Sequence, residues 1–418
     1  MNLQEKSNNV KVIDKDIKWI NIMFKIMWLT TLALFVAIPF QIETGQKLCY
    51  WTFSILNLVC FALTVAKKQN QEKVKGVKDT NFALLCAVIV STCISLGFVG
   101  TFRLNADNLM GYLGFIGIPF VMYYSDYITI EKKDLKFIGV VNIFISILFI
   151  AVSMMDFAYG RDDKWTLSLT LGFTNPNLAA MMIFINTMFL MITRKIFRSR
   201  MTRSLVTFLT VYNIYLIYLT QSRASLGAVL VLFVIAFFSS KYKKRPVLTV
   251  VSVVFPLIFM FTLTYLYKND FFKHVEILGK TLYSGRETYY SEVLSEITSY
   301  EFGPIFGVFR EFQNTHNSAL SLMRFFGVPS MIFYYIFVIK NILGLTKKRF
   351  DNKIAYTCYI AILALYIQSS AESAIVLGGG VWIVAMLSLF AIAGNYKEER
   401  VNVDERTGET EQGNKPSF

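Results

Sequence analysis

Residues 247–267 read VLTVVSVVFPLIFMFTLTYLY, and this uncharged, mostly apolar run decides the fold class. As an α-helix, a run of this length crosses the roughly 30 Å hydrocarbon core of a bilayer. Similar runs recur throughout the 418-residue chain, which is 55% hydrophobic and 17% charged. A soluble protein would interrupt such runs with periodic polar faces. The sequence therefore predicts an all-α polytopic membrane protein.

About twelve transmembrane helices are predicted from length and hydropathy. The apolar runs form a transmembrane domain, 19–394, and cover residues 19–40, 48–66, 81–100, 108–124, 137–155, 177–193, 204–219, 224–239, 247–267, 317–343, 354–368 and 375–394. Residues 1–18 are polar and lack the pattern of a cleavable signal peptide, so they predict a cytoplasmic N-terminal tail. Residues 395–418 are charged and rich in Glu, Gly and Asn, which predicts a disordered cytoplasmic C-terminal tail.

The distribution of basic residues predicts the orientation in the membrane. Loops on the side of both termini carry about three times as many Lys and Arg residues as the opposite loops, and such loops face the cytoplasm. The longest loop, residues 268–316, is then extracytoplasmic. The net charge of +14 arises largely from these short loops. No basic patch interleaved with aromatic residues indicates a nucleic-acid partner.

The cysteines suggest no covalent or metal chemistry. All five lie in or at the edge of apolar runs, and no C-x-x-C pair occurs. Cysteine ligands of a structural metal usually come in such pairs. We therefore expect neither a disulfide nor a metal site, and we expect no cofactor.

Ser284-Gly285-Arg286 is the first candidate for chemistry in the 268–316 loop. It precedes Tyr289 and a helix-like run. One interpretation is a turn before a solvated arginine. The other is a helix that begins near Gly285 and directs backbone N–H groups at an anion beside Arg286. The sequence alone leaves both open.

Arg223 lies at an outer boundary between two spans, in the segment Thr220-Gln221-Ser222-Arg223. An arginine on the outer side is unexpected, because most Lys and Arg residues lie in the loops predicted to be cytoplasmic. It either reaches from a helix end to water or holds an anionic lipid head-group. A guanidinium suits a diphosphate because it offers paired donors and stays charged when desolvated.

His316 is the last residue of the loop, directly before Asn317 and the next span. A lone loop histidine is often only solvent-exposed, but this position lies over the mouth of the helix bundle. An imidazole there suits a proton acceptor. The other histidine, His274, has no polar motif around it, and we assign it no role.

Two further ionisable residues lie near this end of the chain. Arg324 follows His316 on the same span, roughly 12 Å deeper by helical rise. A buried arginine at that depth needs an anion or a carboxylate. Glu372, in the outer turn between the last two spans, is a candidate for that partner or for a second base.

The ordered set of these motifs resembles the bacterial O-antigen ligase and Wzy-type polysaccharide polymerase family. That family shows an N-P-N segment, an S-R pair that opens a span, a loop S-G-R, a glycine-containing turn, and H-N-x-x-L followed by G. The corresponding segments here are Asn175-Pro176-Asn177, Ser222-Arg223, Ser284-Gly285-Arg286, Gly303 to Gly307, and His316-Asn317 with Leu320 and Gly327. A purely structural interpretation also suffices for this segment, with Asn175 or Asn177 as a helix cap and Pro176 near the first turn. Tyr289 and Tyr290 stand where family members often carry tryptophan.

The resemblance implies a GT-C-like, metal-independent, inverting glycosyltransferase on the outer face of the bacterial cytoplasmic membrane. Its donor would be a polyprenyl-diphosphate-linked glycan in the lipid, and its acceptor another glycan. In this chain Arg223 and Arg286 would neutralise the diphosphate, and His316 would be the general base or orient the acceptor. The substrate-binding residues would be Ser284, Gly285, Tyr289, Asn317, Arg324 and Glu372, with Glu372 also the reserve base. Expected partners are a flippase and a chain-length regulator of a polysaccharide assembly system.

Among the functions that share these features, we expect a polymerase that joins lipid-linked repeat units into a capsule, exopolysaccharide or O-antigen. A ligase that transfers glycan to a different acceptor would carry the same motifs. A flippase or transporter would carry buried charges at several mid-membrane positions, where the sequence offers chiefly Lys25 and Arg324. A structural scaffold would tolerate loss of Arg223, Arg286 and His316.

Overall fold

A computed structural model describes residues 3–75, 80–99, 105–161, 167–238, 246–272, 275–277, 280–281, 285–308, 315–347, 353–372 and 379–396. The helices are α1 (Leu3–Ala37), α2 (Glu43–Lys75), α3 (Thr80–Val99), α4 (Ala106–Tyr124), α5 (Lys132–Ser153), α6 (Pro176–Thr193), α7 (Arg200–Leu219), α8 (Arg223–Phe238), α9 (Pro246–Lys268), α10 (Arg286–Ser299), α11 (Gly303–Phe306), α12 (Ser318–Lys347), α13 (Lys353–Gln368) and α15 (Val381–Asn395). Short 3-10 helices cover Ser125–Tyr127, Asp156–Ala158 and Arg194–Ile196. Two antiparallel hairpins pair β1 (Tyr159–Arg161) with β2 (Leu167–Leu169), and β3 (Glu276–Ile277) with β4 (Lys280–Thr281).

Seven of the described helices are long and apolar enough to cross a membrane. They cover Trp19–Ala37, Glu43–Lys67, Thr80–Val99, Lys132–Ser153, Pro176–Ile196, Pro246–Lys268 and Ser318–Leu345, and shorter apolar helices cover Arg223–Val234, Lys353–Gln368 and Val381–Asn395. This is the architecture of an all-α polytopic membrane protein, as predicted. A helix lies over every predicted apolar run, while the number of twelve crossings stays a prediction.

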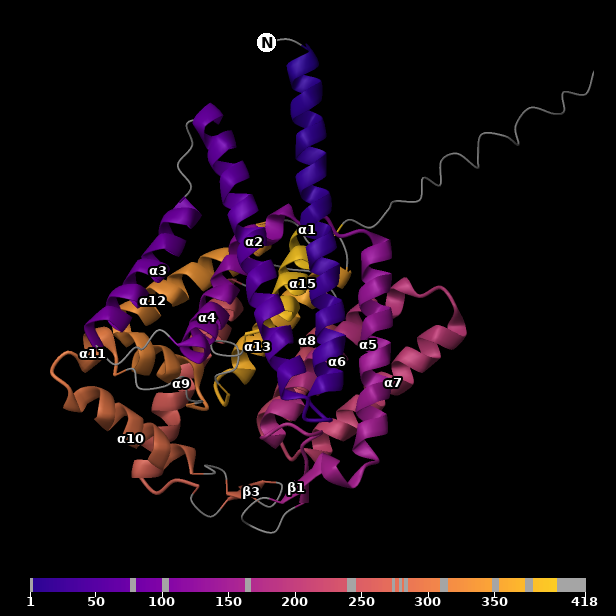
Figure 1. Cartoon of the computed structure of the whole chain (residues 1–418). Helices are drawn as coiled ribbons and strands as arrows, with labels where there is room; N and C mark the ends of the chain where they lie inside the picture. Colours follow the sequence, from indigo (N-terminus) through magenta and orange to yellow (C-terminus); the bar gives the residue numbers. More distant parts are fainter. Residues whose placement is uncertain are drawn as a thin grey trace, which may run out of the picture.

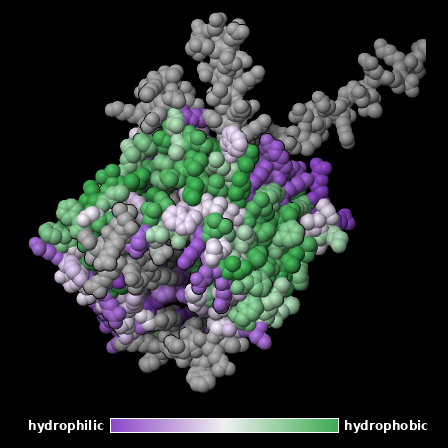
Figure 2. Space-filling view, viewed as in Figure 1, coloured by the Kyte–Doolittle hydropathy of each residue, from purple (hydrophilic) through white to green (hydrophobic). Residues whose placement is uncertain are grey.

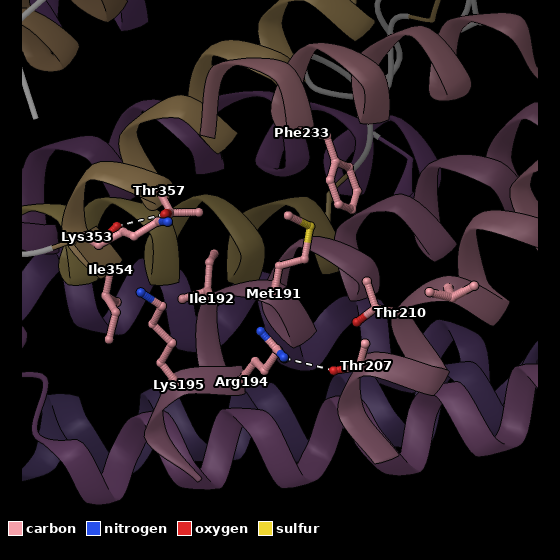
Figure 3. Close-up of a pocket in the computed structure, with 11 residues that line it drawn as sticks. Met191, Ile192, Arg194, Lys195, Thr207, Thr210, Phe233, Lys353, Ile354 and Thr357 are labelled. Carbon is pink, nitrogen blue, oxygen red and sulfur yellow. Dashed lines mark hydrogen bonds between the residues drawn. The ribbon is translucent and has the colours of Figure 1, made fainter. Parts of the chain in front are cut away.

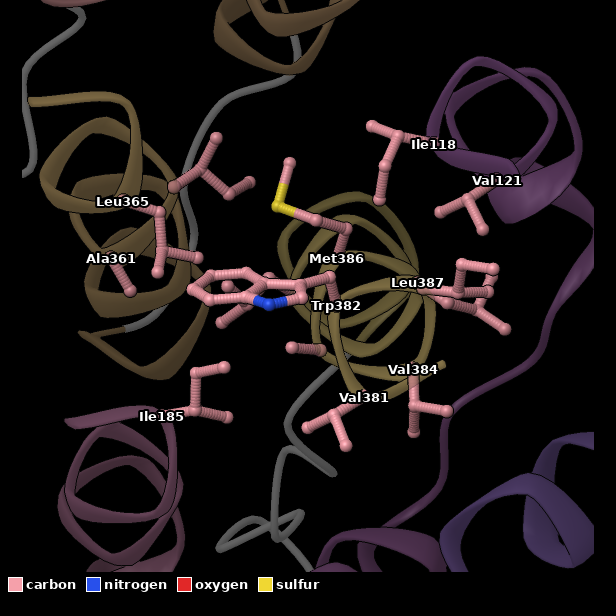
Figure 4. Close-up of a cluster of buried hydrophobic side chains, with 14 of the residues drawn as sticks. Ile118, Val121, Ile185, Ala361, Leu365, Val381, Trp382, Val384, Met386 and Leu387 are labelled. Atoms are coloured by element: carbon pink, nitrogen blue, oxygen red, sulfur yellow. The ribbon is translucent and has the colours of Figure 1, made fainter. Parts of the chain in front are cut away.

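The centre of the bundle is formed by helices that are apolar on all sides. Every residue of α15 from Val381 to Ala393 is buried, and α6 and α13 are buried over most of their length. A helix without a polar face is unfavourable in contact with water, so it is buried among other apolar groups. Trp382, only 1% exposed, packs among side chains of α4, α6 and α13 (Figure 4).

The outer helices expose large apolar side chains instead. Phe98 on α3 and Val247 on α9 are 69% and 75% exposed. Broad hydrophobic areas cover the sides of the bundle (Figure 2). Patches of this size are unfavourable in water and mark a surface that another apolar phase covers. Here that phase is the hydrocarbon of a membrane.

Polar side chains tie the helices to one another inside this apolar body. Asn186 on α6 and Asn213 on α7 both donate to Ser146 Oγ on α5, at 2.6 and 3.1 Å. Trp28 Nε1 on α1 donates to Ser388 Oγ on α15 at 3.0 Å. Such interhelical bonds hold membrane helices together where no hydrophobic force acts between them.

Lys25, one of the two charges expected inside a span, has a carboxylate partner. Its Nζ lies 2.9 Å from Oδ1 of Asp134, a buried residue in the first turn of α5. The other Asp134 oxygen accepts the backbone N–H of Glu131 at 2.9 Å, as part of a helix cap. Lys25 and Asp134 are therefore a structural pair between α1 and α5.

Parts of the 268–316 loop lie at one end of the molecule. α10 and the β3–β4 hairpin lie at the lower end in Figure 1, together with the β1–β2 hairpin of an earlier loop and far from the start of α1 at the top. The predicted loop ends agree with the structure, since α9 ends at Lys268 and α12 begins at Ser318. Helix α1 already begins at Leu3, so the segment predicted as a tail is helical from there. The C-terminal tail beyond Tyr396 and the predicted start of the last span at 375 lie outside the described residues.

The short helix α11 docks into a kink of α12. Gly327 has φ +77° and interrupts the helical backbone of α12 two residues before Pro329. A Cβ on Gly327 would collide with the carbonyl oxygen of Ile305. The N–H of Val308 donates to the carbonyl of Arg324 at 2.7 Å. The kink leaves some backbone carbonyls of α12 without a partner in the helix, and Val308 of the loop donates its N–H to one of them.

Candidate active site

The carboxylate of Glu372 lies at the centre of the residues singled out by the motifs. His316 Nδ1 is 3.2 and 3.3 Å from its two oxygens, and Arg286 Nη2 is 3.6 Å from Oε1. The Glu372 side chain is 3% exposed, against 20% for Arg286 and 33% for His316. Three residues from three separate segments thus form one buried charge cluster.

This geometry defines the role of the imidazole. A carboxylate removed from water must be compensated by donors or positive charge, and His316 and Arg286 provide both. Glu372 only accepts, so the Nδ1–H tautomer of a neutral His316 satisfies this contact and makes Nε2 the acceptor nitrogen of the ring. A base oriented in this way by a buried carboxylate is the arrangement found in catalytic triads.

Arg223 opens a helix that is bonded to the end of α13, close to the turn that carries Glu372. In this bond Gln368 Nε2 donates to Ser225 Oγ on α8 at 2.7 Å. Burial lowers the pKa of the Arg223 guanidinium, and the positive charge of Arg286 lowers the pKa further. A guanidinium stays charged under these conditions. Two guanidinium groups at this end of the bundle offer paired donors that suit an anionic ligand.

Three helices begin at this cluster. Arg223 is the first residue of α8 and Arg286 of α10, while His316 lies two positions before α12. The N-terminus of a helix carries unpaired N–H groups and a partial positive charge, which favour phosphate and other anions. The charge of the two arginines and the starts of α8 and α10 thus point to the same kind of ligand, whereas Ser369 and Asn317 accept N–H groups at the start of α12.

Each of these helix starts has a residue with left-handed backbone. The φ angles are +57° at Gln221, +79° at Gly285 and +53° at His316. Glycine adopts this conformation freely, whereas in Gln221 and His316 it raises the conformational free energy by about 1–2 kcal/mol each. Strain of this kind persists where the surrounding structure enforces it, and it is concentrated at functional sites.

Tyr290 is the residue that holds His316 in place. Its buried hydroxyl donates to the carbonyl of His316 at 3.0 Å and lies 3.4 Å from the carbonyl of Ser370. Burial raises the pKa of Tyr290, so the phenol remains a donor at neutral pH. The neighbouring Tyr289 ring lies edge-on to the His316 ring at 6.3 Å between centroids. One tyrosine positions the histidine and the other flanks it.

Asn317 has a structural role in this geometry. It is fully buried, and its amide donates to the carbonyls of Pro256 and Ser370 at 2.9 and 3.0 Å. Its side-chain oxygen accepts the N–H of Leu320 at 3.1 Å, which caps α12. Both amide donors are thus engaged inside the protein. The substrate-binding role predicted for Asn317 has no support from these contacts.

The turn that carries Glu372 is bonded to two of the three helix starts. Gln368 Nε2 donates to Ser225 Oγ on α8 at 2.7 Å. The N–H of Ser318 on α12 donates to the carbonyl of Ser369 at 3.0 Å, and their hydroxyls are also 3.0 Å apart. These bonds fix the end of α13 and thereby the position of Glu372.

Arg324 pairs with a different carboxylate from the one expected. Its Nη2 lies 3.1 Å from Oε2 of Glu296 on α10, while Glu372 pairs with His316 and Arg286. Of the two roles considered for Glu372, partner of Arg324 or second base, the first does not agree with these contacts, because Glu296 on α10 pairs with Arg324. Arg324 and Glu296 join the loop to the membrane helix.

One acidic residue escaped the sequence analysis. Glu287 is 8% exposed, and the structure gives its Oε2 no hydrogen-bond partner among the described residues. The feature of the sequence that could have identified Glu287 is its position beside Arg286 in the first turn of a helix, where acidic residues are favoured. Gly285 caps this helix without a side-chain bond. Ser284 and His274 lie outside the described residues.

Two other features of the sequence have a plain structural outcome. Asn175 caps α6, since its side chain accepts the N–H of Asn177 at 2.8 Å, and Pro176 is the first residue of the helix. Of the two predicted candidates for the cap, Asn175 and Asn177, the structure has Asn175. Across the described ranges, no group of three or more His, Cys, Asp or Glu side chains is placed to hold a metal ion, and the five cysteines are not disulfide-bonded.

No protein-family model, curated protein or solved structure matches this chain. The family resemblance therefore stays a prediction from the motifs. The function must be inferred from the geometry of the cluster formed by Arg223, Arg286, His316 and Glu372.

Proposed function

We propose that the protein is an extracytoplasmic glycosyltransferase that polymerises polyprenyl-diphosphate-linked oligosaccharide units into a cell-surface polysaccharide. The observation that carries the proposal is the contact of Arg286 and His316 with the buried carboxylate of Glu372, beside the start of the helix that bears Arg223. A cationic anion site and an oriented base lie side by side at one end of an apolar helix bundle. These are the two requirements of transfer from a lipid-linked diphosphate.

The anion site receives the leaving group. When the bond between the anomeric carbon and the diphosphate oxygen breaks, negative charge develops on the diphosphate. Arg223 and Arg286 stabilise this charge with paired N–H donors, and the starts of α8 and α10 add to it. Nucleotide-sugar enzymes often use a metal for this purpose; in this proposal two fixed guanidinium groups do the same work.

The histidine serves the acceptor. As the acceptor hydroxyl attacks the anomeric carbon from the opposite face, Nε2 of His316 takes its proton. The imidazolium that forms is stabilised by Glu372, which stays ionised. The products are the elongated glycan, with inverted configuration at the new bond, and the polyprenyl diphosphate. Tyr289, edge-on to the imidazole, flanks the path of the sugar.

The two charges expected inside the membrane also favour an enzyme over a transporter. Lys25 and Arg324 pair with Asp134 and Glu296 at 2.9 and 3.1 Å. Charges along a transport path must exchange partners as the substrate moves. Here each pair ties two helices together. A ligase that uses a different acceptor would need the same cluster and remains the alternative function.

The proposal places both termini in the cytoplasm and the cluster on the outer face of a bacterial cytoplasmic membrane. The loop charge bias and the gathering of α10 and both hairpins at one end support this orientation (Figure 1). The donor and the growing glycan are then the direct partners. A flippase and a chain-length regulator complete the assembly system.

The test is polymer production in cells that depend on this protein. Arg286→Lys and His316→Ala should abolish polymer and cause single lipid-linked units to accumulate, at unchanged protein level in the membrane. The matched controls are Arg198→Lys and Glu301→Gln, two exposed residues outside the cluster, and both should make normal polymer. Normal chain length in the His316 and Arg286 variants would contradict the proposal.

A further inference from the structure

An open, largely apolar cavity with basic residues at its edge lies among α6, α7, α8 and α13, away from the active-site cluster. Its volume is about 320 Å³. Arg194, Lys195 and Lys353 line it together with apolar side chains such as Met191 and Phe233 (Figure 3). Cationic and apolar groups thus face the same space.

This cavity lies at the opposite end of the bundle from Glu372. It includes Lys353, the first residue of α13, whereas Gln368 at the other end of α13 contacts the start of α8. Sixteen helical residues span about 24 Å, close to the thickness of the bilayer core. The two sites therefore lie near opposite faces of the membrane, and the basic-loop bias places the cavity on the cytoplasmic side.

The guanidinium groups near the cavity are held in place by hydrogen bonds to the protein, since Arg203 Nη2 donates to the carbonyl of Arg198 at 3.0 Å. Arg194 Nε donates to Thr207 Oγ1 at 2.8 Å, which fixes the guanidinium and leaves its terminal nitrogens to point elsewhere (Figure 3). No carboxylate belongs to the described lining. A second hollow of about 600 Å³ shares Arg194 and Thr207 with the first and adds Arg200 and Arg203. Four or more positive charges therefore face two connected hollows.

An apolar track runs from these charges along α7. Phe208, Val211, Tyr215 and Tyr218 are each more than half exposed. Their spacing of three to four residues places them on one face of the helix. Phe208 and Val211 also line the second hollow. A free anion would need only the basic residues of the hollows. A lipid with a phosphate head-group and a hydrocarbon tail would use the basic residues and the apolar face of α7 together.

We propose that this cavity binds the phosphate head-group of an anionic membrane lipid from the cytoplasmic leaflet. Arg194, Arg203 and Lys353 bind the phosphate, and the acyl chains lie along the exposed face of α7. Basic pockets between membrane helices on the cytoplasmic side suit such head-groups, and guanidinium groups provide paired donors for phosphate oxygens. The site is separate from the proposed glycan transfer and does not depend on it.

The test measures thermal unfolding of the purified full-length protein in a neutral detergent. Phosphatidylglycerol is added to one series, phosphatidylcholine to the second and inorganic phosphate to the third. We expect a saturable rise of several degrees in the unfolding midpoint with phosphatidylglycerol alone. A triple variant, Arg194→Gln with Arg203→Gln and Lys353→Gln, should lose at least half of that rise. The basic control Lys132→Gln with Lys136→Gln, on α5 outside the cavity, should keep it.

Each remaining outcome decides against the proposal. An equal rise in the triple variant and the control would show that the lipid binds elsewhere. An equal rise with inorganic phosphate would identify a soluble anion as the ligand, and an equal rise with phosphatidylcholine would identify a general effect of lipid. If the triple variant does not fold, the single variant Arg194→Gln is compared with Lys136→Gln. It should require at least a threefold higher lipid concentration for half-maximal stabilisation, and an unchanged concentration would overturn the proposal.

Discussion

The imidazole of His316 and the carboxylate of Glu372 lie 3.2 Å apart, although 56 positions separate them in the chain. The contact joins the end of the 268–316 loop to the turn after α13. A carboxylate at Nδ1 favours the Nδ1–H tautomer, in which Nε2 is the basic nitrogen. The proposed chemistry depends on this pair, because the two arginines alone would bind an anion without transferring a glycan.

Replacing the carboxylate removes the orientation of the base. Glu372→Gln should lower the transfer rate by about 10²–10⁴-fold, since a neutral amide neither stabilises the imidazolium nor fixes the tautomer. The rate is measured as elongation of a lipid-linked glycan by the purified protein. Glu301→Gln, an exposed change in the same loop, should leave it unchanged. Full activity in the Glu372 variant would remove Glu372 from the mechanism.

The arginines are expected to act through their paired donors as well as through their charge. Arg223→Lys and Arg286→Lys keep the charge but lose the planar fork that matches a diphosphate. Each should lower the transfer rate by about 10²-fold or more. Arg198→Lys is the control at the other end of the bundle. If both lysine variants kept wild-type rates, a positive charge alone would be sufficient for catalysis. The proposed paired hydrogen bonds from each arginine to the diphosphate would then be wrong.

Tyr290 is expected to position His316 without contacting the substrate. Tyr290→Phe removes the hydroxyl that donates to the His316 carbonyl, which should lower the free energy of unfolding by about 1 kcal/mol. Because His316 has left-handed backbone, its release should lower kcat more than it changes the KM of the donor. Tyr265→Phe, an exposed change on α9, should affect neither. An unchanged kcat in the Tyr290 variant would leave this residue with a purely structural role.

The glycine kink of α12 gives a test of the fold itself. Gly327→Ala places a methyl group against the Ile305 carbonyl and forces a left-handed alanine, so it should cost about 3 kcal/mol or more of unfolding free energy. Gly344→Ala in the same helix is the matched control, because no atom lies within 4 Å of its Cβ. It should stabilise the helix by about 0.5–1 kcal/mol. Thermal unfolding measures both, and equal midpoints would contradict the docking of α11 into the kink.

The sequence predicted the helices because hydrophobic runs of membrane length are a local property. It also predicted a span that begins at 317 from its hydropathy, whereas a helix start near Gly285 was only one of two interpretations of Ser284-Gly285-Arg286, and the structure begins α10 at Arg286. The kink at Gly327 was not predicted. It appears only when α11 packs against α12, which is a tertiary effect and leaves no periodic pattern in the sequence.

The candidate site was predicted in its members and only partly in its connections. Arg223, Arg286 and His316 were grouped by motif order, and Glu372 was considered as a base or as the partner of Arg324. Which acid pairs with which base depends on how α10 folds back over α12. The spacing of residues in the sequence does not predict how α10 folds back over α12. Tyr290 and Glu287 were missed as parts of the site for the same reason, because their roles follow from burial.

The most direct test of the central claim is a reconstituted transfer reaction. The purified protein is placed in liposomes with a polyprenyl-diphosphate-linked oligosaccharide, and both glycan length and released polyprenyl diphosphate are measured. We predict longer glycans with one polyprenyl diphosphate released per bond formed, and neither product from His316→Ala at equal protein content. Movement of the lipid-linked glycan across the bilayer without elongation, or wild-type elongation by His316→Ala, would contradict the account.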